Sequence, residues 1–176
     1  RGHLEVLQWL LPKNEHRSEN RRVGQRAARG GHLEILQLAK SEGSSEFNDK
    51  IVAFAAARGG HIDILAWLKE TNAPLESACM GAASGGQIEA LKWLKARGYI
   101  CKAAAYLDAA QEGHLEVMKW LKEEKGLWIP NATLSSAAKG GSVPVVSWLT
   151  EQGSGCGPHK RLTMQRLQET GTWCSG

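Results

Sequence analysis

Histidine is the side chain in this sequence whose chemistry would be most useful at a metal or catalytic site. Four of the six histidines recur at one position of a repeated phrase: His3, His32, His61 and His114. The phrase places them in successive structural units, which we expect to lie about 10 Å apart, the usual distance between packed helices. They therefore cannot converge on one ion or substrate, and we interpret them as turn residues that pack or cap at a helix junction.

Cysteine offers a second possibility near the C-terminus, where Cys156, His159 and Cys174 could supply soft metal ligands. Their spacing matches no zinc signature, and a fourth ligand is not apparent. The sequence also contains no GxSxG elbow, HExxH helix, phosphate loop or dinucleotide fingerprint. We therefore expect no metal, no cofactor, no small-molecule substrate and no enzymatic activity in this segment.

Tryptophan recurs seven residues after the first glycine of the phrase, at Trp9, Trp67, Trp93, Trp120 and Trp148. A ladder of aromatic rings could stack nucleobases, as aromatic platforms do in proteins that bind single strands. The second unit carries Leu38 at this position, however, and the position lies at the edge of an apolar arc. We therefore predict that the ladder packs in the core or between repeats.

Arginine gives the strongest indication of a binding surface. Arg22, Arg26 and Arg29 stand at i, i+4 and i+7, within about 60° of one another on a helix, and opposite Ala27-Ala28. They are predicted to share an exposed face. The position of Arg29 continues as a polar row that varies inside an otherwise repeated frame, and we take it as a candidate partner-binding row: Arg58, Ser84, Gln111 and Lys139. The alternative is an ordinary solvated helix face.

These side chains are positioned by a repeat. Its phrases read GHLEVLQWL, GHLEILQLA, GHIDILAWL, GQIEALKWL, GHLEVMKWL and GSVPVVSWL, beginning at Gly2, Gly31, Gly60, Gly86, Gly113 and Gly141. An alanine pair precedes the last five phrases, at Ala27-Ala28, Ala56-Ala57, Ala82-Ala83, Ala109-Ala110 and Ala137-Ala138. Each unit is therefore predicted to be one short helix that ends in small residues, a left-handed glycine turn, and a second helix.

The second helix of each unit is predicted to touch more than one neighbour. Counting the opening glycine as zero, apolar residues fall at positions 2, 4, 5, 7 and 8. They cover an arc of roughly 220°, far wider than the stripe of about 100° on a surface helix. A helix that contacts its own partner and both neighbouring repeats explains this width, and such stacking is typical of a solenoid.

The pattern AAxxGHLEVLKWL resembles the ankyrin-repeat family, especially the shortened, degenerate repeats found in arrays of algae, oomycetes and giant viruses. The mean period is 139/5, about 28 residues, against about 33 in that family. The family's TPLH tetrapeptide is replaced by Arg22-Val23-Gly24-Gln25, Ile51-Val52-Ala53-Phe54, Ser77-Ala78-Cys79-Met80, Ala104-Ala105-Tyr106-Leu107 and Ala132-Thr133-Leu134-Ser135. The resemblance implies an all-α, helix-turn-helix repeat solenoid with short loops and little or no β-hairpin.

The repeats divide the chain into a solenoid over residues 1–153 and a degenerate C-terminal half repeat or tail over 154–176. The solenoid is predicted to contain a half repeat at 1–16 and five repeats at 17–43, 44–70, 71–98, 99–126 and 127–153. A polar loop is expected from Leu11 to Asn20, and one first helix is expected to begin near Pro74. Both ends cut through a repeat, so we expect a fragment of a longer array.

Charge and composition favour an interaction protein without naming its partner. The net charge of +4 comes from 22 Lys and Arg against 18 Asp and Glu, a mixed surface that permits nucleic acid without indicating it. Four cysteines without a CxxC pair favour a reducing, intracellular and cytoplasmic location. No apolar run approaches the roughly 20 residues of a membrane span.

The sequence therefore predicts a non-catalytic scaffold that binds an unidentified protein on the concave face of a repeat stack, the face that first helices line in ankyrin-like proteins. The alternatives are a helical repeat that binds nucleic acid, and a targeting module of a longer adaptor protein.

Overall fold

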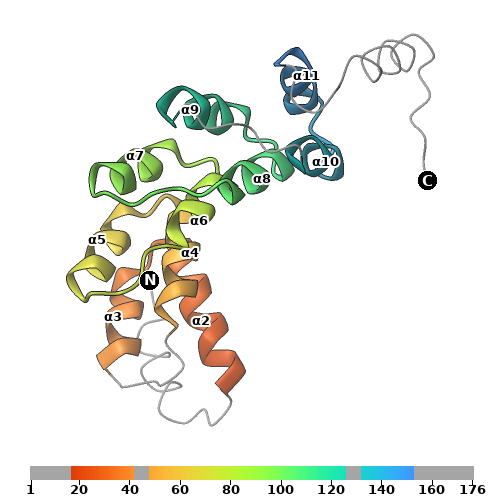
Figure 1. Cartoon of the computed structure of the whole chain (residues 1–176). Helices are drawn as coiled ribbons and strands as arrows, with labels where there is room; N and C mark the ends of the chain where they lie inside the picture. Colours follow the sequence, from red (N-terminus) through yellow and green to blue (C-terminus); the bar gives the residue numbers. More distant parts are fainter. Residues whose placement is uncertain (1–16, 42–47, 126–131, 153–176) are drawn as a thin grey trace.

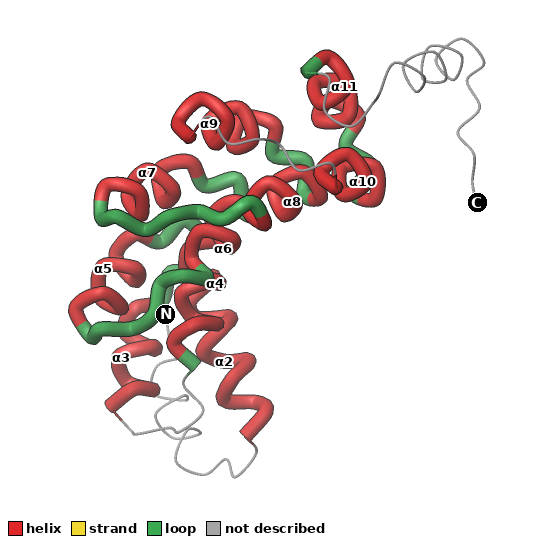
Figure 2. The backbone as a smooth tube through the Cα atoms, in the orientation of Figure 1, coloured by secondary structure: helices red, strands yellow, loops and turns green. Residues whose placement is uncertain are grey.

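All regular structure in the residues that the computed structural model describes, 17–41, 48–125 and 132–152, is helical. Figure 2 shows helices joined by loops, with no strand in these residues, which confirms the predicted all-α class for them. None of these helices is long and apolar enough to cross a membrane. The helices form five pairs: α2 (Arg17–Gly30) with α3 (Leu33–Ser41), α4 (Asp49–Gly59) with α5 (Ile62–Glu70), α6 (Ala78–Ser84) with α7 (Ile88–Ala96), α8 (Ala104–Gln111) with α9 (Leu115–Lys125), and α10 (Ala132–Lys139) with α11 (Val143–Glu151).

The five pairs follow one another along an arc (Figure 1). Each first helix packs against its own second helix, and the first helices also pack on one another in the order α2, α4, α6, α8, α10. These five lie on the inner side of the arc, and their exposed surface is called the inner face below. Each pair falls inside one of the predicted units between residues 17 and 153. The half repeat 1–16 and the tail 154–176 lie outside the described residues.

A turn of two or three residues joins the helices of each pair. At the end of α4, Gly60 has a φ of 79°, and its N–H and that of His61 donate to the carbonyls of Ala57 and Ala56 at 3.1 and 3.0 Å. Glycine enters this left-handed region at little cost because it has no Cβ. The predicted glycine turn is confirmed here and recurs, with φ between 68° and 81°, at Gly31, Gly86, Gly113 and Gly141.

Small residues let the first helices approach one another closely. Gly81 of α6 lies so near the carbonyl oxygen of Phe54 in α4 that an added Cβ would overlap it. The alanine pairs fill the same layer and are fully or almost fully buried, except for Ala138, which is exposed in the last pair. Backbone therefore packs directly on backbone, and equivalent residues of successive pairs fall in columns along the arc.

The second helices bury a narrower stripe than the sequence predicts. Positions 4, 5 and 8 after the turn glycine hold most of the fully buried residues, for example Ile64, Leu65 and Leu68 in α5. These positions span about 100°, the usual width for a helix with one buried face. Positions 2 and 7 are mostly half-buried edges, and Val143, at position 2 of the last pair, is 60% exposed. The predicted arc of 220° therefore includes two partly exposed borders.

Two predicted boundaries are wrong. α2 begins at Arg17, inside the stretch predicted as a loop from Leu11 to Asn20, whose first part lies outside the described residues. α6 begins at Ala78 rather than near Pro74. Leu75 is 1% exposed, so the segment before α6 runs as a loop that inserts an apolar side chain into the core, and burial of that side chain outweighs the helix signal of the proline.

Substituting Gly81 with alanine tests the close contact between α4 and α6. We expect Gly81→Ala to lower the free energy of unfolding by about 1–3 kcal/mol, because the new methyl group forces two backbones apart. Gly24→Ala, inside α2, is the matched control, since its Cβ would meet only a methyl group of Val52 in α4, at 3.9 Å. Alanine should stabilise that helix by about 0.5–1 kcal/mol. Urea unfolding measures both, and equal effects of the two substitutions would contradict the account.

Candidate binding face

Histidines of the repeated phrase link successive helix pairs. His61 donates from Nε2 to the carbonyl oxygen of Arg29 at 2.9 Å, and His114 donates in the same way to Ser84 at 3.1 Å. Each accepting carbonyl lies in the last turn of a first helix, where the helix itself offers no donor. Histidine therefore acts at these two positions as a bridge between repeats. His3 lies outside the described residues.

Metal-ligating side chains do not gather in the described part of the chain, where no group of three His, Cys, Asp or Glu residues lies close enough to hold an ion. The cluster considered from the sequence, Cys156, His159 and Cys174, lies outside the described residues. Cys79 and Cys101 are both buried in the core.

The polar row two residues before each turn glycine lies on the first helices. Arg29, Gln111 and Lys139 are exposed, as the sequence predicts for a row available to a partner. Arg58 is half-buried and forms an ion pair with Glu112 at 3.2 Å. The row therefore has exposed cations toward its two ends, on α2 and α10, and a paired arginine near its centre.

Ser84 corrects the predicted row. Its side chain is only 5% exposed, and its hydroxyl donates to the carbonyl of Gly81 at 3.0 Å within α6. The small side chain folds back onto its own helix, which leaves room for Arg58 of α4 to reach Glu112, just after α8. Ser84 is therefore not a side chain that a partner could contact, although the sequence places it in the exposed row.

Arg26 does not share the inner face with the row. Arg26 is exposed but sits five residues before its turn glycine, and the equivalent residues Ala55 and Gly81 are buried against the preceding first helix. Arg26 therefore faces the N-terminal end of the described stack rather than the inner face. The side chain of Arg22 lies outside the described residues. Arg29 belongs to the inner face.

Carboxylates gather beside Arg58 at the centre of the inner face. Asp108 of α8 occupies the position at which Gly81 packs against α4, so it is partly buried between neighbouring helices. Burial and, to a smaller extent, the nearby Glu112 carboxylate raise the pKa of Asp108, while the Arg58 guanidinium opposes the shift. One cation thus faces two acidic groups, and the centre of the row presents little unpaired positive charge.

Sequence reasoning missed an apolar column on the inner face. Phe54, Met80 and Leu107 stand six residues before their turn glycines and are each half-buried. They lie one helical turn before Arg58, Ser84 and Gln111, so both sets share one face of their helices. The signal was present in the sequence, because these three residues end the tetrapeptides that replace TPLH.

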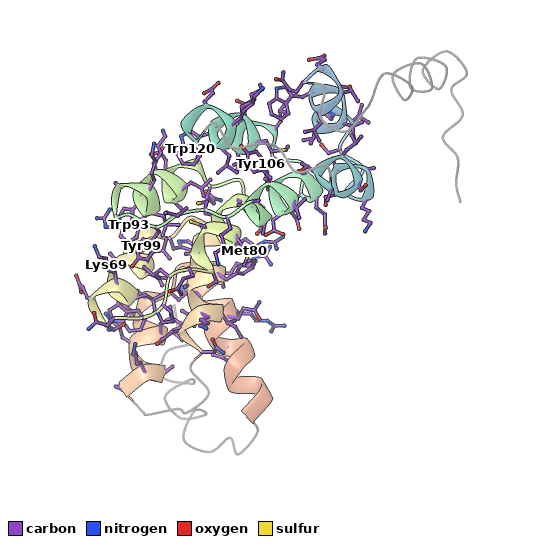
Figure 3. All side chains as sticks on the ribbon, in the orientation of Figure 1. Lys69, Met80, Trp93, Tyr99, Tyr106 and Trp120 are labelled. Atoms are coloured by element: carbon purple, nitrogen blue, oxygen red, sulfur yellow. The ribbon has the colours of Figure 1, made fainter. Side chains whose placement is uncertain are left out.

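The tryptophan ladder packs as predicted where it is described. Trp67, Trp93, Trp120 and Trp148 are half-buried and pack against the hydrophobic core. Cations cover three of the rings: Lys40 lies 5.2 Å from the Trp67 centroid, Arg97 lies 3.8 Å from Trp93, and Lys122 lies 5.7 Å from Trp148. Figure 3 shows Trp93 and Trp120 on the side of the second helices, away from the inner face. Trp9 lies outside the described residues.

Replacing His114 tests the bridge between repeats. His114→Ala should lower the free energy of unfolding by about 1 kcal/mol, because the Ser84 carbonyl loses a donor. His114→Gln is the control, because Gln87 occupies the same position in the fourth phrase and lies over Gly60 of the preceding pair. Urea unfolding should give a smaller loss for glutamine than for alanine. If alanine had no effect, the bridge would contribute nothing to stability.

Asp108 gives a prediction for the pH dependence of stability. Its pKa is raised in the folded state, so folding favours the protonated acid, and the energetic cost of its ionisation appears as pH rises through the folded pKa. Asp108→Asn should therefore stabilise the protein at pH 7, by no more than about 1 kcal/mol for a half-exposed charge. The gain should vanish at a pH below the unfolded pKa. Thermal unfolding at both pH values checks this, and a loss of stability at pH 7 would contradict it.

No protein-family model, no curated protein and no solved structure matches the chain.

Proposed function

We propose that the chain is a helix-turn-helix repeat solenoid of the shortened ankyrin-like kind, and that it is a non-catalytic scaffold which binds a protein partner on its inner, concave face. The recurrent glycine turns and the ordered contacts between first helices support the architecture. Stacked repeats offer a long surface that one partner can contact at many points. The four cysteines without a CxxC pair support a location inside the cell.

The observation that carries the proposal is that the residues used in packing repeat from pair to pair, whereas the residues on the inner face do not. Turn glycines and most alanine pairs repeat and are used in packing, while the inner-face positions vary between repeats. Arg29, Gln111 and Lys139 are exposed there. Exposed side chains of varied chemistry on a rigid frame are suited to specific recognition.

Nucleic acid is the second candidate, and the exposed Arg26 and Arg29 favour it. The carboxylates of Asp108 and Glu112 beside Arg58 argue against it, because two acidic groups around one cation would repel a phosphate backbone that crosses the face. A targeting module of a longer adaptor protein is compatible with the same binding face.

Charge reversal on the inner face tests the function. The double variant Arg29→Glu with Lys139→Glu should retain at least tenfold less of the proteins that the unaltered chain captures from a cell lysate. The matched control, Lys69→Glu with Lys92→Glu, makes the same change in net charge on the second helices, and it should leave capture intact. Quantitative mass spectrometry of the retained proteins measures both.

Equal capture by both variants would overturn the proposal. Salt-sensitive binding of RNA or DNA, lost in the inner-face variant alone, would favour the second candidate instead.

A further inference from the structure

The apolar column formed by Phe54, Met80 and Leu107 lies half-buried on the inner face. In the described part of the chain, these side chains are not among the partly buried ones that pack against the core, unlike Leu134 and the tryptophans. Figure 3 shows Met80 on the inner side of the arc, opposite the labelled Trp93 and Tyr99. Each of the three helices α4, α6 and α8 thus carries one large apolar side chain at the equivalent position, six residues before its turn glycine.

The column has polar ends. At the same position, α2 carries Gln25 and α10 carries Ser135, and both are exposed. Helices that pack in contact lie about 8–10 Å apart, so the column spans about 20 Å across α4, α6 and α8. Covering one such side chain removes apolar surface from water and so favours binding. A ligand that fits this face has apolar side chains at its centre.

The charged side chains of the inner face indicate which groups are favoured at the two ends of that ligand. The side chains of Arg29 on α2 and Lys139 on α10 are exposed and form no ion pair or hydrogen bond within the described residues. At the centre, Arg58 is paired with Glu112, so it offers less to an anion. Acidic groups are therefore favoured at both ends of a bound segment and disfavoured at its middle.

We propose that the inner face binds a peptide segment of a partner protein that carries apolar side chains at its centre and aspartate or glutamate at both ends. Four helix spacings of about 8–10 Å separate α2 from α10, about 32–40 Å in all, which an extended chain covers in about 10–12 residues. The apolar centre contacts Phe54, Met80 and Leu107, and the acidic ends lie near Arg29 and Lys139. This inference rests on the proposed function, because it assumes that the inner face is the binding surface.

Selection from a phage-displayed library of random 14-residue peptides on the immobilised full chain tests the inference. Enriched peptides should carry apolar residues at the centre and Asp or Glu toward both ends. Fluorescence anisotropy with the synthetic peptides should show at least tenfold weaker binding to Met80→Glu. The double variant Arg29→Glu with Lys139→Glu should weaken binding to the same extent.

Two further variants keep the test decisive. Ile100→Glu is the control, because Ile100 is 78% exposed in the loop between α7 and α8, and it should change affinity less than twofold. Leu107→Gln gives a milder change in the column and replaces Met80→Glu if circular dichroism shows that the latter is not helical.

The outcomes separate this inference from the proposed function. If enriched peptides lose affinity with the inner-face charge reversal but lack the acidic ends or the apolar centre, the peptide class is wrong and the binding face stands. If they bind every variant equally, or if no peptide is enriched, the inference is overturned. In that case the lysate experiment decides alone whether the inner face binds a protein.

Discussion

The first helices of this protein approach one another so closely that backbone packs on backbone. Gly81 leaves no space for a side chain against the Phe54 carbonyl, and most of the alanine pairs are fully buried in the same layer. Because the contact is between backbones, it fixes the position of each first helix along its axis relative to the next first helix. Equivalent positions therefore form columns, and the polar row and the apolar column both follow from that registration.

Between the second helices, long side chains form the contacts that join one pair to the next. Lys40 of the first described pair donates to Thr71 at 2.9 Å and lies over Trp67 of the next pair. Lys122 makes the same kind of contact with Gln152 and Trp148 at the other end. Charged and aromatic groups on this side are thus used to join repeats. The inner face differs, because its first helices are joined mainly through small residues, and Arg29, Gln111 and Lys139 stay exposed there while Arg58 pairs with Glu112.

The repeated frame is predictable from the sequence because it depends on local signals, namely a left-handed glycine, paired alanines and a short apolar stripe. The boundaries and the exposure of single positions are less predictable because they depend on neighbours in space. Ser84 shares the exposed register of Arg29, yet it is buried by its small size and its bond to Gly81. Pro74 resembles a helix start, yet burial of Leu75 holds the segment as a loop. The ion pair of Arg58 with Glu112 spans 54 residues of sequence, and no local pattern indicates it.

Site-specific photocrosslinking tests most directly whether the inner face is the binding surface. A photoreactive amino acid at Gln111, exposed on the inner face, would be compared with the same amino acid at Glu89, exposed on α7. Both positions are outside the core, so neither should disturb folding. The account predicts that irradiation in a cell lysate joins a protein to the chain labelled at position 111, and not to the chain labelled at position 89. Crosslinks of equal yield at both positions, or at position 89 alone, would contradict it.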